Sequence, residues 1–77
     1  MNMSQTIGDK IRALREDANL NQTELGRALK MTQRKMSYIE CGKYEPSIED
    51  IRAICDHFKI SADYLLGIKK GYEYPDR

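Results

Sequence analysis

The stretch that decides the fold is "NQTELGRALKMTQRKMSYIECGK", residues 21–43. Its apolar residues recur three and four positions apart, which indicates short amphipathic helices rather than strands. The first helix of this pair includes Leu25 and Leu29. The second helix of the pair, with Thr32 as its N-cap, runs through about Cys41. About three residues form the turn between them. Two short helices joined in this way have the layout of a helix-turn-helix.

The second helix of this pair has two unlike faces. Its apolar side carries Met36 and Ile39. Its other side carries amide, guanidinium, hydroxyl and phenol groups, on Gln33, Arg34, Ser37 and Tyr38. The major groove of DNA admits one α-helix and presents donors and acceptors that such groups match, and in a helix-turn-helix the second helix enters that groove. These four side chains are therefore the predicted base contacts. An amide suits adenine and a guanidinium suits guanine, although Arg34 is equally able to reach a phosphate.

The apolar pattern continues on both sides of the pair. A helix is predicted over residues 5–18, capped by Ser4 or Thr6. A fourth helix opens at Ser47 and includes Phe58, and a short fifth lies between Ser61 and Gly67. No strand pattern is found. The predicted fold class is all-α, with five short helices around one core. The predicted core residues are Leu25, Met36, Ile39, Ile51, Ile54 and Leu65.

Length and composition agree with a single small domain. The chain has 77 residues, of which 40% are hydrophobic and 32% charged, within the range of soluble globular domains. Its longest apolar run is too short to span a membrane, and "MNMSQTIGDK" lacks the apolar core of a signal peptide. A cytoplasmic protein is expected. Cys41, Cys55 and the single His57 do not form a metal-ligand spacing, so reduced thiols and no metal or other cofactor are expected.

The net charge of +1 conceals an uneven distribution. Residues 22–43 carry five basic and two acidic side chains, a net charge of +3. Residues 44–58 carry four acidic and one basic side chain, a net charge of −3. A surface that binds a polyanion such as double-stranded DNA is therefore predicted in the middle of the chain.

Residues 7–67 resemble the Cro/repressor-type (XRE) helix-turn-helix family, through "NQTEL", "SYIECGKYEPS" and the closing "ISADYLLG". The resemblance implies a five-helix, lambda-repressor-like DNA-binding domain over residues 1–68, followed by a C-terminal tail over residues 69–77. It further implies a transcriptional regulator, usually a repressor, that binds a palindromic operator as a homodimer. Regulation of transcription is thus an expectation from the family. The dimer surface expected here is the fifth helix, with Tyr64, and the loop before the fourth.

The resemblance also assigns particular residues. The family's phosphate-binding positions fall on Asn21, Gln22 and Lys43. Its buried arginine–glutamate pair, which links the first and third helices, falls on Arg15 and Glu40. Lys35 is a further candidate for a phosphate contact, with simple solvation as the alternative.

Three positions depart from the family pattern. Gly26 stands where alanine is usual, and Lys30 stands in the turn where glycine is frequent. A lysine there must adopt a left-handed backbone, or the turn must differ. Cys41 stands where asparagine is common, and a thiol caps a helix poorly.

Two classes of function remain open from the sequence. One is the DNA-binding regulator, and the other is a protein-interaction module, such as an antitoxin or adaptor that binds a partner protein. Both can hold, because the basic middle and the acidic fourth helix lie in different segments. An enzyme is not expected, because the sequence shows no nucleophile–base pair, metal cluster or glycine-rich phosphate loop.

Overall fold

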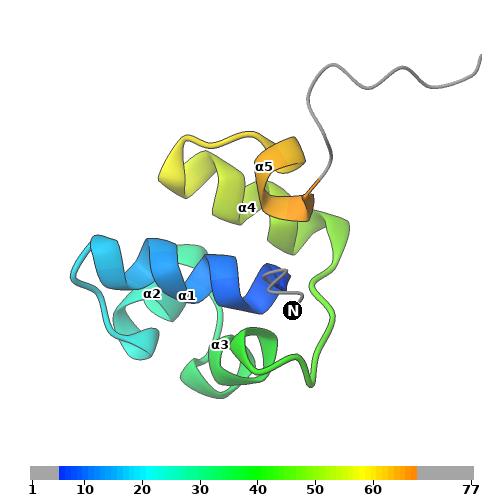
Figure 1. Ribbon diagram of the computed structural model, residues 1–77. Coiled ribbons are helices and arrows are strands. Elements are labelled where there is room, and N and C mark those ends of the chain that lie inside the picture. The colour runs from blue at the N-terminus through cyan, green and yellow to red at the C-terminus, as the bar shows by residue number, and fades with distance from the viewer. Residues whose placement is uncertain (1–5, 68–77) are drawn as a thin grey trace, which may run out of the picture.

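The structure is a computed structural model that describes residues 6–67, and these residues form five helices. These are α1 (Ile7–Asp17), α2 (Gln22–Leu29), α3 (Gln33–Glu40), α4 (Ile48–Phe58) and α5 (Ala62–Leu66) (Figure 1). Residues 6–67 contain no strand, so the predicted all-α class and the five helices are confirmed. The predicted tail, residues 69–77, lies outside the described residues. The first helix is shorter than the predicted span of residues 5–18 at both ends.

Every helix begins at a side chain that accepts a hydrogen bond from its first turn. The caps are Thr6, Asn21, Thr32, Ser47 and Ser61. In α1, α2 and α4 an acidic side chain three residues later accepts a hydrogen bond from the backbone N–H of the cap residue, which completes a capping box. Such caps are worth about 1 kcal/mol each, which matters in helices of about three turns or fewer.

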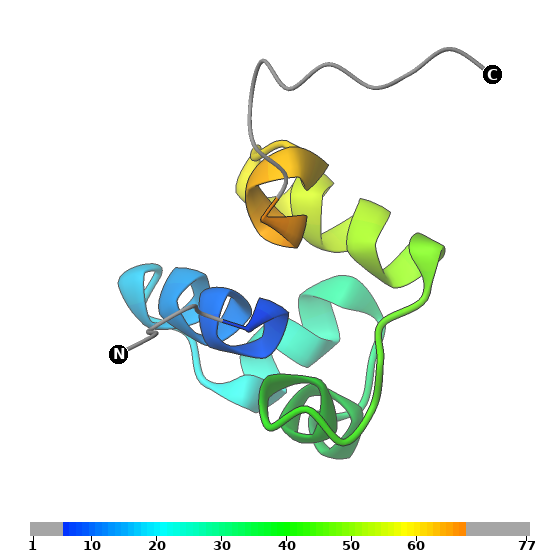
Figure 2. The same ribbon diagram turned by 45° about the vertical axis from the view of Figure 1, so that its right-hand side comes forward.

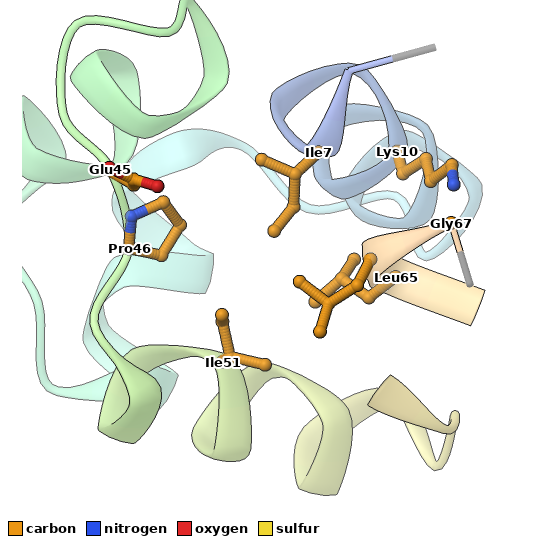
Figure 3. A pocket seen from close by; sticks show the side chains of 8 residues that line it. Ile7, Lys10, Glu45, Pro46, Ile51, Leu65 and Gly67 are labelled. Carbon is orange, nitrogen blue, oxygen red and sulfur yellow. The ribbon is translucent and has the colours of Figure 1, made fainter. Parts of the chain in front are cut away.

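The core is formed by large apolar side chains from all five helices. Those almost fully buried are Ile11, Leu25, Met36, Ile39, Ile54 and Leu65. Five of the six predicted core residues are therefore confirmed. Ile51 is only partly buried, because it lines a pocket of about 510 Å³ between α1, α4 and α5 (Figure 3). In that view Ile51 and Leu65 both point into the space beside Ile7.

The helices are arranged so that α3 lies at one side of the molecule. In both views α1 lies between α3 and the pair formed by α4 and α5 (Figures 1 and 2). The close approach of α1 to the end of α3 depends on Gly8. A Cβ atom at Gly8 would lie 2.5 Å from the carbonyl oxygen of Glu40 and 2.6 Å from that of Ile39. No larger residue fits there without separating the two helices.

The turn between α2 and α3 uses two of the three departures from the family pattern together. Lys30 adopts the left-handed conformation, with φ of 61°. The chain then returns over α2, where the Met31 N–H donates to the Gly26 carbonyl at 2.7 Å. A Cβ at Gly26 would lie 2.7 Å from the Met31 carbonyl oxygen. The glycine in α2 thus makes room for this turn, and the left-handed lysine replaces the glycine that is frequent at its own position.

Candidate nucleic-acid interface

A buried carboxylate, Glu40, connects three helices at the base of α3. Its side chain is 1% exposed. Arg15 of α1 donates to it twice, from Nε to Oε2 at 2.7 Å and from Nη2 to Oε1 at 3.0 Å. The remaining guanidinium nitrogen of Arg15 donates to the Leu20 carbonyl at 2.9 Å. The ion pair expected between these two residues is therefore present, and its geometry is bidentate.

The same carboxylate is the inner end of a hydrogen-bonded chain that reaches the surface. Gln22 Nε2 donates to Glu40 Oε1 at 3.1 Å, and Gln33 Nε2 donates to Gln22 Oε1 at 2.7 Å. Each glutamine is the first residue of its helix. A predicted phosphate contact and a predicted base contact are thus joined to each other and to the buried pair. The sequence pattern did not predict this chain, although it places a glutamine at the start of both helices.

The charges in this chain stabilise one another. Burial alone would raise the pKa of Glu40, but hydrogen bonds from Arg15 and Gln22 outweigh it and hold that pKa below its ordinary value. The hydrogen bond to Glu40 likewise raises the pKa of Arg15, against the opposing effect of burial. Glu40 is therefore ionised at neutral pH, and it holds the start of α2 and the end of α3 together.

The outward face of α3 presents the four predicted base-contacting side chains. Gln33, Arg34 and Tyr38 are exposed, and Ser37 is half-buried. All four lie on one helix of eight residues whose opposite face buries Met36 and other core side chains. The structure therefore brings them together on one accessible surface.

Two further predicted phosphate contacts flank this face. Asn21 caps α2, where its Oδ1 accepts from the Glu24 N–H at 2.7 Å, so its side-chain N–H groups are left to act as donors. Lys43 is exposed just beyond α3, and its backbone N–H donates to the Tyr38 carbonyl at 2.8 Å. Both lie next to an end of a helix that carries predicted contacts.

Lys35 is placed differently from the expectation of a cation available to phosphate. Its Nζ lies 3.1 Å from Asp50 Oδ1 and 5.1 Å from the centre of the Tyr44 ring. The hydrogen bond to Asp50 raises the pKa of Lys35. Burial alone would raise the pKa of Asp50, but hydrogen bonds from Ser47 and Lys35 lower it below its ordinary value. The charge of Lys35 is thus paired within the protein.

Cys41 is exposed at the C-cap of α3, with its Sγ 3.7 Å from the Tyr38 carbonyl oxygen. Cys55 is buried in the core, where burial raises its pKa. Between residues 6 and 67, no three His, Cys, Asp or Glu side chains gather as a metal site would require. Nor is any helix in that range long and apolar enough to cross a membrane.

Comparisons with known proteins agree with this geometry. A family described as "Helix-turn-helix domain" matches residues 6–65. The P22 c2 repressor, solved in complex with a synthetic operator, is 32% identical with a TM-score of 0.77, over 82% of this chain and 96% of that one. The gene regulator ClgR of Corynebacterium glutamicum is 25% identical with a TM-score of 0.70, over 77% of this chain and 63% of that one.

A curated relative, the immunity repressor protein of Bacillus phage phi105, is 26% identical over 62 residues. The match covers 80% of this chain but 43% of the relative, so the chain spans less than half of that repressor's length.

Proposed function

This chain belongs to the helix-turn-helix domain family, and from that premise we propose that it is a sequence-specific DNA-binding transcriptional regulator, most simply a repressor. The observation that carries the proposal is the outward face of α3, where Gln33, Arg34, Ser37 and Tyr38 lie together above a buried anchor. A helix of this kind fits the major groove, and amide and guanidinium groups near its N-terminus match base edges. The operator complex of the similar P22 c2 repressor supports the same use here.

The proposed phosphate contacts are Asn21, Gln22 and Lys43. Gln22 is the first residue of α2, where backbone N–H groups and the helix dipole favour an anion. One N–H of its side chain is held by Glu40, which leaves the second available. Each phosphate neutralised by a basic side chain such as Lys43 steepens the loss of affinity with salt. Binding is therefore expected to weaken strongly as ionic strength rises.

We propose that the protein acts as a homodimer on a palindromic site, with half-sites about 34 Å apart. The proposed dimer surface is α5 with the loop before α4. Exposed apolar side chains lie on or next to these elements: Ile48, the first residue of α4, is 77% exposed, and Tyr64 and Leu66 of α5 are also exposed. Exposed apolar surface is typical of interaction sites. The proposed location is the cytoplasm, and no catalytic activity or cofactor is proposed.

Selection of bound sequences from a random duplex pool tests the proposal. A palindromic motif is the expected result, and its half-site spacing would report the dimer directly. Gln33→Ala and Arg34→Ala should each weaken binding by about 1–3 kcal/mol and relax the base preference. Lys43→Ala should weaken binding to all sequences alike. If these variants bind selected and random duplexes as the unsubstituted protein does, the assignment of α3 is wrong.

A second candidate function is binding of a partner protein, as an antitoxin or adaptor does. The exposed Ile48, Tyr64 and Leu66 favour it, because they lie outside α3 and leave its polar face free. Absence of any enriched sequence in the duplex selection would favour this second function over the first.

A further inference from the structure

We propose that Lys35 is a positioning residue for DNA binding rather than a phosphate contact: through Asp50 and Tyr44 it holds the loop that carries Lys43. This inference rests on the DNA-binding function proposed above. It replaces the phosphate contact that the sequence suggested for Lys35, and it makes the nearby Lys43 dependent on it.

The ammonium of Lys35 has two partners, and both lie beyond α3 in the chain. Asp50 Oδ1 is 3.1 Å from Nζ, and the centre of the Tyr44 ring is 5.1 Å from it. Lys35 is in the first turn of α3, Tyr44 is in the loop, and Asp50 is in the first turn of α4. The Lys35 ammonium therefore links the start of α3 to the start of α4, across the connecting residues 41–47.

Asp50 is a fixed partner. Its side chain is 11% exposed, and its Oδ2 accepts from the Ser47 N–H at 3.0 Å as part of the capping box of α4. The second carboxylate oxygen is thereby directed to Lys35. Moving Lys35 to a phosphate would leave a largely buried carboxylate without its cation, which is costly. The pair is therefore expected to persist when DNA binds.

The loop is anchored at its other end by α3 itself. The Lys43 and Tyr44 N–H groups both donate to the Tyr38 carbonyl, at 2.8 and 3.2 Å. The backbone of Lys43 is thus held by α3, and the ring of the next residue, Tyr44, lies against Lys35. Without Lys35 the chain that follows Lys43 loses its contacts through Tyr44 and Asp50, and the proposed contact of Lys43 with a DNA phosphate is held less firmly.

The salt dependence of binding separates positioning from phosphate contact. A lysine that neutralises a phosphate contributes about 0.9 to the slope of log affinity against log salt. Because Lys35 is proposed to act through Lys43, Lys35→Met should weaken binding about three- to tenfold, and adding it to Lys43→Met should leave the slope of that variant unchanged. Lys59→Met is the matched control, because Lys59 is the C-cap of α4 and the connection from α4 to α5 lies away from α3 (Figure 1). If Lys35→Met, but not Lys59→Met, reduces the slope of the Lys43→Met variant by about 0.9 more, the proposal is overturned.

Asp50→Asn gives a test in which the two roles predict opposite signs. If Lys35 contacts phosphate, removal of a competing carboxylate near the DNA leaves binding equal or tighter. If Lys35 is a positioning residue, Asp50→Asn weakens binding by the same factor as Lys35→Met, and the double variant is no weaker than either single one. Asparagine keeps an oxygen that accepts from Ser47, so the cap of α4 is retained. Equal or tighter binding by Asp50→Asn would contradict the proposal.

Amide hydrogen exchange in the free protein supplies a readout that needs no DNA. Lys35→Met should speed exchange of the Lys43 and Tyr44 amides and leave that of Ile39, within α3, unchanged. Unchanged loop exchange would overturn the positioning role even if binding falls. If the unsubstituted protein shows neither sequence preference nor salt dependence, the proposed function fails instead, and the exchange result still decides what Lys35 holds.

Discussion

Removal of the Arg15 guanidinium should be the most damaging single change to a polar side chain in this domain. Arg15→Met keeps an apolar stem of similar length but removes both hydrogen bonds to Glu40 and the one to Leu20. Glu40 then keeps a hydrogen bond from Gln22 and a more distant cation, Arg12, 3.6 Å away. The buried carboxylate loses most of what compensates its charge.

The magnitude follows from that inventory. Loss of one partner of a buried ion pair costs about 3–5 kcal/mol. Because the contacts from Gln22 and Arg12 remain, the loss of unfolding free energy in Arg15→Met should lie near the lower end of this range, at about 3 kcal/mol. In a domain of this size each 1 kcal/mol shifts the melting temperature by about 4–8 °C, so a fall of about 12–24 °C is expected.

The pH dependence should also reverse. In the unsubstituted protein the pKa of Glu40 lies below its ordinary value. Ionised Glu40 therefore contributes fully to stability above about pH 4.3, and this contribution is lost as pH falls through the pKa of the folded state. In Arg15→Met, burial should instead raise this pKa above the unfolded value. Protonation then relieves the buried charge, and the variant should gain stability as pH falls from 7 towards 5.

Urea unfolding is followed by circular dichroism at about pH 7.0 and about pH 5.0. It measures both the loss of stability in Arg15→Met and the pH dependence of that stability. The matched control is Arg12→Met, since Arg12 is half exposed and farther from Glu40. It should cost about 1 kcal/mol or less. The reasoning would be refuted if Arg15→Met cost no more than Arg12→Met, or if it were no more stable at the lower pH.

Three further substitutions or reagents test other features. Gly8→Ala should destabilise the domain by about 1–3 kcal/mol in thermal melts, because its Cβ would press on carbonyl oxygens of α3. This loss should exceed the gain from alanine's better helix propensity, and unchanged stability would show that α1 shifts away from α3 without cost. Lys30→Gly should raise the free energy of unfolding by up to about 1 kcal/mol, measured as a higher urea midpoint, since glycine adopts the left-handed conformation without strain; a lower midpoint would contradict this. A thiol reagent should modify exposed Cys41 quickly and buried Cys55 only on unfolding; equal rates would contradict the burial assigned to Cys55.

The elements that sequence predicted well are those determined by near neighbours. A cap at Thr32 or Ser47 depends on a backbone N–H three residues away, so the pattern of residues is sufficient to find it. The turn at Lys30 was reduced to two alternatives, and the structure shows the left-handed one. The apolar period likewise found most of the core.

The interactions that sequence missed join residues far apart in the chain. Lys35 pairs with Asp50 fifteen positions later, and Gln33 with Gln22 eleven positions earlier. No local period signals either contact, because each depends on how two helices meet. Ile51 follows the apolar period of α4, yet the pocket beside α5 leaves it partly exposed.

The chain from Glu40 to Gln33 has a direction, and that direction has a consequence at the surface. An ionised carboxylate only accepts hydrogen bonds, so Gln22 must present its NH₂ group to Glu40 and its oxygen to Gln33. Gln33 must then turn its own NH₂ group towards Gln22, which leaves its oxygen and one N–H for a base. A charge that never reaches the surface thus selects which of two amide orientations an exposed residue offers. Glu40→Gln would remove that selection and allow the amides of Gln22 and Gln33 to flip together. Gln33 would then discriminate less well between bases.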